Sequence, residues 1–259
     1  MAGRHCIFCG RKGVSNEHII AKRFRKLFVV PGDGIPLLRG TGDAGVVGMW
    51  QGPIFDAQVK RVCRDHCNNG WMRAMDDQVE APLSRMMTGQ RCELTEEEQN
   101  AIAAWSVRIA MLYQYRRIPP LPVAAERLDW FYRHRKAPPG STVWLAASAP
   151  NPGYTLYSMR WSATRAEDGA EHNGVLSTLL AGHLVVQVFD VPGWERMHFT
   201  VPERLKGFDV QIWPSSEFIR VWPPTHALTP EDLGYFVMRF GHPEREWNPS
   251  RQIRGSTLG

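Results

Sequence analysis

The chain lacks several features that would have narrowed its function at once. Among its 259 residues there is no run of about 18 apolar residues that could cross a membrane as a helix. No apolar stretch precedes Cys6, so nothing at the N-terminus resembles a secretory signal peptide. We therefore expect a soluble, cytoplasmic protein that does not enter a membrane and whose cysteines stay reduced.

Several motifs of well-known enzyme classes are also absent. The sequence has no P-loop, no G-x-S-x-G nucleophile elbow and no H-E-x-x-H zinc motif. The segment from Gly40 to Gly45 matches a dinucleotide-binding loop by its letters, but no helical pattern follows it. Residues 31–56 are rich in glycine and proline, and we predict that they form turns or a short hairpin rather than a cofactor site.

Cysteine is scarce, but its placement is informative. Four of the five cysteines form two close pairs: Cys6 with Cys9, and Cys63 with Cys67. Close pairs in a reducing compartment favour a metal over disulfides, so a four-cysteine structural zinc site is the leading interpretation. His66 lies inside the second pair and is a rival ligand, whereas Cys92 is expected to be a small buried hydrophobic residue.

Positive charge is concentrated around the cysteines. Residues 1–75 hold 12 Lys and Arg against 5 Asp and Glu, a net charge of +7, and the remainder of the chain carries −2. A basic segment of this kind suits a polyanion, because each cation that neutralises a phosphate releases condensed counterions. The candidate nucleic-acid-binding residues are Arg11, Lys12, Lys22, Arg23, Arg25, Lys26, Lys60, Arg61, Arg64 and Arg73.

Between the two cysteine pairs stands Glu17-His18, and Asn68 follows the second pair directly. With these residues in this order, the first third of the chain resembles the HNH endonuclease family, especially HNH proteins of phages and high-GC bacteria. The resemblance implies a ββα-metal fold with a treble-clef zinc, and metal-dependent hydrolysis of DNA, with RNA a less favoured substrate. It also implies that His18 activates water as the general base, while Glu17 and Asn68 hold a catalytic Mg²⁺ or Mn²⁺.

These implied roles are chemically reasonable. An imidazole titrates near neutral pH, and a positioned general base contributes about 10²- to 10⁴-fold to a rate. Carboxylate and amide oxygens are hard ligands that suit a divalent cation, which offsets the charge that develops on a phosphate. A palindromic DNA target would call for a homodimer, although no segment of the sequence specifies an interface.

The sequence departs from the commonest HNH pattern at three points. Glu17 replaces the more usual aspartate, the second cysteine pair has one extra residue, and the middle asparagine that supports the catalytic histidine is not evident. Gln58 stands at a suitable distance before Cys63 to replace that asparagine, and Asn69 could exchange roles with Asn68. A catalytically inactive zinc treble clef that binds nucleic acid, or that is only structural, is therefore the alternative.

The overall pattern predicts an α+β protein with three parts. These are an HNH module over residues 1–90, a helical connector over residues 91–137 and a mostly antiparallel α+β domain over residues 138–259. Helices are expected to begin at Asn68 with an end or kink at Pro82, at Thr95, at Ala124 and at Thr229. Strands are expected over residues 142–147, 154–161, 184–191, 199–201, 210–213 and 218–222.

Overall fold

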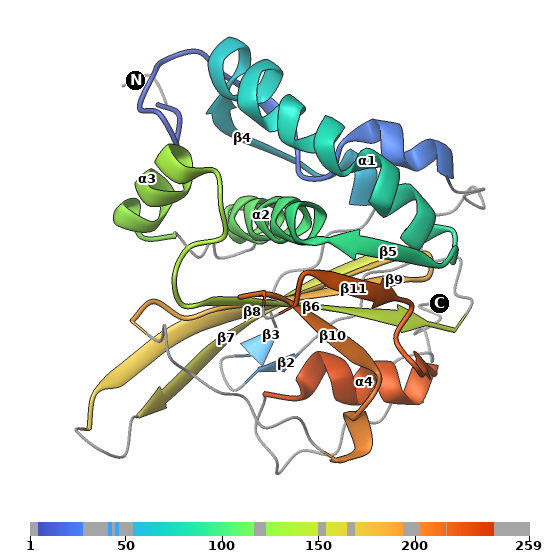
Figure 1. Ribbon diagram of the computed structural model, residues 1–259. Helices are drawn as coiled ribbons and strands as arrows, with labels where there is room; N and C mark the ends of the chain where they lie inside the picture. The colour runs from blue at the N-terminus through green and yellow to red at the C-terminus, as the bar shows by residue number, and fades with distance from the viewer. Residues whose placement is uncertain are drawn as a thin grey trace, which may run out of the picture.

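The computed structural model describes residues 5–27, 41–42, 45–46, 54–116, 123–149, 154–164, 169–193, 203–215 and 217–240. Over these residues the protein mixes helices and strands, as the predicted α+β class requires. Figure 1 shows the helices of the first half of the chain stacked above a twisted sheet formed by the second half. The predicted strand at residues 199–201 lies outside the described residues.

The N-terminal part is built on two antiparallel strands, β1 (Val14–His18) and β4 (Gln58–Cys63). A 3-10 helix over Lys22–Leu27 follows β1, and a 3-10 turn over Ile54–Asp56 precedes β4. Between these two elements in the sequence, β2 (Thr41–Gly42) and β3 (Gly45–Val46) pair as a short hairpin, as expected for the glycine-rich segment.

Three helices follow β4. A helical segment over Arg64–Met72 is kinked at Gly70, whose φ of −92° and ψ of −115° are not helical, and then leads into α1 (Arg73–Met87). β5 (Cys92–Thr95) follows, then α2 (Glu96–Gln114) and α3 (Ala125–His134). Thr95 caps α2 as predicted: its side chain accepts a hydrogen bond from the Glu98 N–H, and the Glu98 carboxylate accepts one from the Thr95 N–H.

The second half of the chain forms one large sheet. Its strands β6 (Ser141–Ser148), β7 (Tyr154–Thr164), β8 (Glu171–Ala181), β9 (Leu184–Asp190) and β10 (Asp209–Trp213) lie in the order β10-β6-β9-β8-β7, and every neighbouring pair is antiparallel. β12 (Ala227–Leu228) adds a short parallel pairing to β6, while β11 (Ile219–Trp222) pairs with β5.

Helices cover both faces of this sheet. α4 (Pro230–Met238) begins at Thr229 with a capping box, as predicted, and its Phe236 packs on Ala146 and Val185. α2 packs on the opposite face and also contacts α1, so that it lies between the N-terminal part and the sheet (Figure 1). Every residue of α2 from Ala101 onward is buried, as in a helix enclosed on all sides.

α1 does not end at Pro82, so the predicted helix end was wrong. A proline inside a helix costs about 3 kcal/mol, because it removes one N–H donor and crowds the preceding turn. α1 nevertheless continues to Met87, since Val79 and Leu83 are fully buried in the core, and each such side chain contributes about 1.5 to 3 kcal/mol. Tertiary packing therefore outweighs the local signal at this position.

One hydrophobic cluster runs through most of the molecule. It begins at Cys6 and Phe8, passes through α1 and α2, and reaches the sheet and Trp222. The cysteine pairs are thus packed on the same core as the sheet. No helix in the described parts of the chain is both long enough and apolar enough to cross a membrane.

Candidate functional site

The four paired cysteines meet at one point in space. The Sγ atoms of Cys6 and Cys67 are 3.7 Å apart, those of Cys9 and Cys63 are 3.4 Å apart, and all four lie within 4.8 Å of one another. Disulfide sulfurs would be about 2.05 Å apart, whereas four thiolates around a tetrahedral zinc are separated by about 3.8 Å. The four cysteines could therefore hold a metal such as zinc, as the sequence predicted.

Short backbone contacts shape the first cysteine pair into a knuckle. The Cys6 N–H donates to the Arg11 carbonyl at 2.8 Å, and the Gly10 N–H donates to the Cys6 carbonyl at 3.0 Å. Gly10 has a φ of +70°, a conformation that favours glycine, directly after Cys9. The Ile7 N–H donates to the Arg61 carbonyl at 3.0 Å and so fastens the knuckle to β4.

The second pair spans a strand end and the first turn of a helix. Cys63 ends β4 and caps the helical segment that begins at Arg64, and Cys67 follows four residues after Cys63. The extra residue thus lies where the extended backbone of β4 turns into the helical segment. The prediction that Asn68 caps a helix was wrong, since Asn68 lies inside this segment.

The pKa values of the cysteine thiols are shifted in different directions. A hydrogen bond with Cys67 lowers the pKa of the Cys6 thiol to about 4 and raises the pKa of Cys67.

His66 is directed to a different partner. Its Nε2 lies 2.7 Å from the hydroxyl of Tyr132 on α3, and no atom of His66 belongs to the sulfur cluster. The guanidinium of Arg135 lies over the rings of Trp71 and Tyr132, at 3.9 and 4.2 Å from their centroids. Arg135 is desolvated, which lowers its pKa, and the charges of Cys67 and Cys9 act against that shift.

We expect Arg135→Gln to weaken zinc binding about 10- to 100-fold, the usual effect of losing a group that supports metal ligands. Four thiolates and one zinc ion carry a net negative charge, which the Arg135 cation offsets. Zinc competition against a chelator measures the effect. Arg133→Gln on the same helix is the matched control, because Arg133 is 68% exposed and pairs with Asp129. Equal zinc affinity in the two variants would rule out this role for Arg135.

His18 and Gln58 face each other across the antiparallel strand pair of β1 and β4. They are paired in register, and the Gln58 amide nitrogen lies 2.6 Å from His18 Nε2. The structure thus places Gln58 where an amide could support the histidine. Burial, followed by the charge of Lys22, lowers the pKa of His18, and Asp56 opposes this shift. A half-buried imidazole with a lowered pKa is neutral near pH 7.

Glu17 is turned to the other side of β1. It is only 6% exposed, and burial raises its pKa to about 7, with Arg108 lowering it and Asp76 raising it further. Successive side chains of a strand point to opposite faces, so Glu17 faces α1 and α2 whereas His18 faces Gln58. The structure therefore does not place the two predicted catalytic side chains on one face.

A buried polar network next to Glu17 was not predicted from the sequence. Arg108 of α2 is fully buried; it donates to the Asp76 carboxylate of α1 and to the Met72 carbonyl. The indole N–H of Trp105 donates to the same carboxylate at 2.9 Å. One indication of it was present in the sequence: Arg108 stands in the middle of a mostly apolar stretch of α2, where a buried arginine needs a carboxylate partner.

The two asparagines lie in the helical segment before α1, which packs against β1 and β4. Asn68 is half-buried and Asn69 is exposed. The Asn68 carbonyl accepts the Arg73 N–H. The segment thus brings Asn68 to the side of the strand pair, close to the second cysteine pair.

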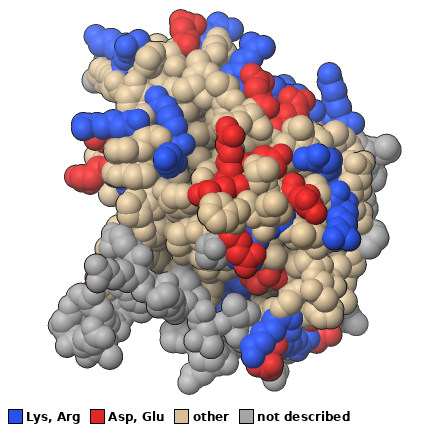
Figure 2. All heavy atoms as spheres, in the orientation of Figure 1, with Lys and Arg blue, Asp and Glu red and all other residues tan. Residues whose placement is uncertain are grey.

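The predicted basic residues do not form a patch of one sign. Arg23 pairs with Asp77 and Glu80 of α1, and Arg25 lies 3.7 Å from Asp56. Figure 2 shows Lys and Arg side chains along the upper and outer parts of one face and Asp and Glu side chains gathered in its middle. Lys60 and Arg61 differ, because both line a polar cavity beside Gln58. The exposed cations among the rest are Arg11, Lys12, Lys22, Lys26, Arg64 and Arg73.

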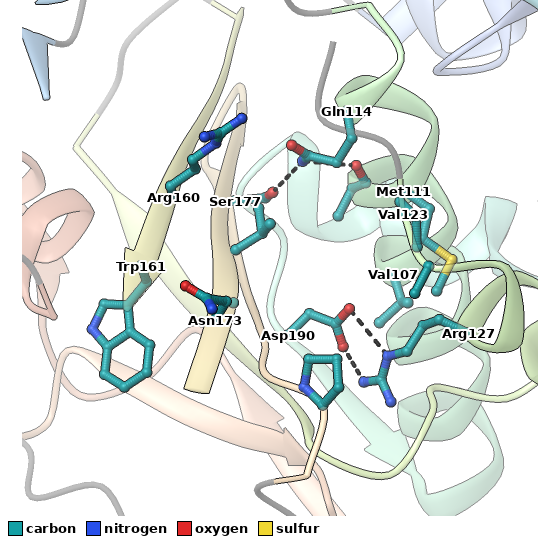
Figure 3. Close-up of a pocket in the computed structure, with 15 residues that line it drawn as sticks. Val107, Met111, Gln114, Val123, Arg127, Arg160, Trp161, Asn173, Ser177 and Asp190 are labelled. Atoms are coloured by element: carbon teal, nitrogen blue, oxygen red, sulfur yellow. Dashed lines mark hydrogen bonds and ion pairs between the residues drawn. The ribbon is translucent and has the colours of Figure 1, made fainter. Parts of the chain in front are cut away.

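A separate cavity of about 390 Å³ lies between α2 and the sheet. Figure 3 shows Gln114 near Ser177 at one side of it and the ion pair of Arg127 with Asp190 at another. Apolar side chains of α2, such as Met111, also line it. No residue that the sequence singled out as a site residue belongs to the described lining.

Known proteins add no further guide to the site. Comparisons of the chain with protein-family models, with curated proteins and with solved structures gave no match.

Proposed function

We propose that this chain is a metal-dependent endonuclease that hydrolyses DNA phosphodiester bonds. His18 is the general base, Glu17 and Asn68 hold a divalent Mg²⁺ or Mn²⁺, and the four clustered cysteines hold a structural zinc. The observation that carries the proposal is the His18–Gln58 pair. It sets a half-exposed imidazole on a strand pair that the cysteine cluster fastens, beside a cavity that Lys60 and Arg61 line.

Gln58 gives the imidazole a defined orientation. The amide nitrogen of Gln58 is the atom nearest His18 Nε2; when the amide is turned over, its oxygen accepts a hydrogen bond from the Nε2–H, which leaves the lone pair on Nδ1. Nδ1 then takes a proton from water as the oxygen attacks phosphorus and the bond to the 3′ oxygen breaks. The products carry a 5′-phosphate and a 3′-hydroxyl.

Glu17 and Asn68 offer hard oxygen ligands, and a bound divalent cation would neutralise the charge that develops on the phosphate. The buried Glu17 carboxylate would depend on that cation for its ionised form. Its raised pKa shows that burial opposes its ionised form, and a nearby cation would favour that form.

The proposal predicts that His18→Ala lowers the rate of DNA cleavage about 10²- to 10⁴-fold. The measurement is the nicking of supercoiled plasmid by zinc-loaded protein with Mg²⁺, Mn²⁺ or EDTA. His134→Ala is the matched control, because His134 is an exposed histidine of α3. Cleavage that survives His18→Ala, or products with 3′-phosphate or cyclic-phosphate ends, would contradict the assigned roles.

One observation favours a second candidate, a zinc module that binds DNA without cutting it. Glu17 faces Asp76 and Arg108 rather than the side of His18, and a buried carboxylate can serve as part of a structural network. The same assay separates the two functions. DNA binding without nicking, at any of the tested metals, would support the binding module.

A further inference from the structure

A polar cavity of about 430 Å³ opens beside the His18–Gln58 pair. Gln58 forms part of its lining and also contacts His18, the proposed catalytic histidine. Tyr115 and Arg116, which follow the last turn of α2, also line it. The cavity thus lies between the strand pair β1 and β4, which carries the histidine, and the end of α2, a helix outside the predicted nuclease module.

β4 carries a bulge at two consecutive cations that line this cavity. Ser15 pairs with Val62 and Glu17 pairs with Val59, so Lys60 and Arg61 together oppose the single residue Asn16. In a regular strand, neighbouring side chains would point to opposite faces. The extra residue interrupts this alternation at Lys60 and Arg61, which both contribute to the lining, and bulges of this kind commonly re-aim side chains next to functional sites.

The lining is basic, and part of it is held in place. It contains the cations of Lys60, Arg61 and Arg116 against the carboxylate of Asp56, whose charge is partly balanced by Arg25 at 3.7 Å. The Arg61 guanidinium lies 5.8 Å from the centroid of the Tyr115 ring, within the range of a cation–π contact. A concave site with a net positive charge favours an anion such as a phosphate.

We propose that this cavity binds a backbone phosphate of the DNA strand, next to the phosphate that is cleaved. This inference rests on the proposed function, because it takes His18 as the position of the scissile bond. It assigns substrate binding to Lys60, Arg61 and Arg116, and it extends the proposed DNA-binding surface from the strand pair β1 and β4 to the end of α2.

The test compares Lys60→Ala, Arg116→Ala and the double variant in the full-length, zinc-loaded chain. All three carry His18→Ala in addition, so that bound DNA stays intact. The dissociation constant for a short duplex is measured over a range of salt concentrations. Each lost phosphate contact is expected to reduce the slope of log K against log salt by about 0.9, and the double variant by about 1.8. The loss should be equal for duplexes of unrelated sequence.

Arg133→Ala on α3 is the matched control, since it removes an exposed cation far from the cavity in sequence. Zinc content and melting temperature establish that each variant is folded. A slope for Arg116→Ala equal to that of the control would overturn the assignment of α2, and unchanged slopes in all variants would overturn the phosphate site. A reduced slope seen with RNA duplexes only would also overturn it.

Failure of this inference can be told apart from failure of the proposed function. Plasmid nicking that depends on His18, together with unchanged salt slopes, would leave the nuclease and remove the phosphate site. Reduced slopes in a protein that never nicks DNA would leave the phosphate site and remove the catalytic role.

Discussion

Removal of zinc is expected to unfold the N-terminal part of this chain, with a loss of folding free energy on the order of 10 kcal/mol. The sulfur cluster lies inside the core, where Phe8 contacts Trp71 edge-on at 5.3 Å between ring centroids and also approaches Phe131 at 6.1 Å. Without the metal, four thiols and a knuckle of few residues would have to hold this packing alone. Titration with a strong zinc chelator, followed by circular dichroism and tryptophan fluorescence, measures the effect.

Two cysteine variants provide the matched comparison. Cys6→Ser removes a ligand and should abolish stoichiometric zinc binding, whereas Cys92→Ser changes a buried cysteine of β5 outside the cluster and should retain it. If the chelated protein and Cys6→Ser unfold at the same urea concentration as the untreated protein, the cluster has no structural role.

Replacing Asp76 with alanine is expected to lower the free energy of unfolding by about 3 to 5 kcal/mol. The change would leave the guanidinium of the fully buried Arg108 without its carboxylate and would remove the acceptor of the Trp105 indole N–H. An uncompensated charge in the interior is costly because water cannot solvate it. Urea denaturation of the zinc-loaded protein gives the free energy directly.

The exposed pair of Asp129 and Arg133 supplies the control, because its side chains are 50% and 68% exposed. Asp129→Ala should cost less than about 1 kcal/mol. Replacing both buried partners, as Asp76→Leu with Arg108→Met, should recover most of the loss, since a well-packed apolar pair often substitutes for a buried ion pair. A loss in Asp76→Ala no larger than in Asp129→Ala would show that Asp76 contributes little, for example because Glu17 replaces it.

Features that depend on neighbouring residues could be predicted from the sequence. The caps at Thr95 and Thr229 carry their acidic partners three residues later, and both form capping boxes. The strands β6, β7, β9, β10 and β11 were found where expected, apart from small differences at their ends. The meeting of the two cysteine pairs followed from the close spacing within each pair.

Features set by distant contacts could not be predicted. β8 was missed because Asn173 and Gly174 interrupt its pattern; a Cβ atom at Gly174 would lie only 2.4 Å from Val191 Cγ2, so glycine is required there by packing. The orientation of Glu17 depends on where α1 and α2 place Asp76 and Arg108. The bulge in β4 likewise depends on pairing with β1, which no local pattern records.

The enclosed position of α2 makes the two halves of the molecule interdependent. One side of this helix presents Arg108 to the network beside Glu17, and another contacts the strands of the sheet. Separating the halves would expose a helix whose side chains are buried all round from Ala101 to Gln114. Loss of the metal at one end of the chain is therefore expected to weaken the packing of α2 on the sheet at the other.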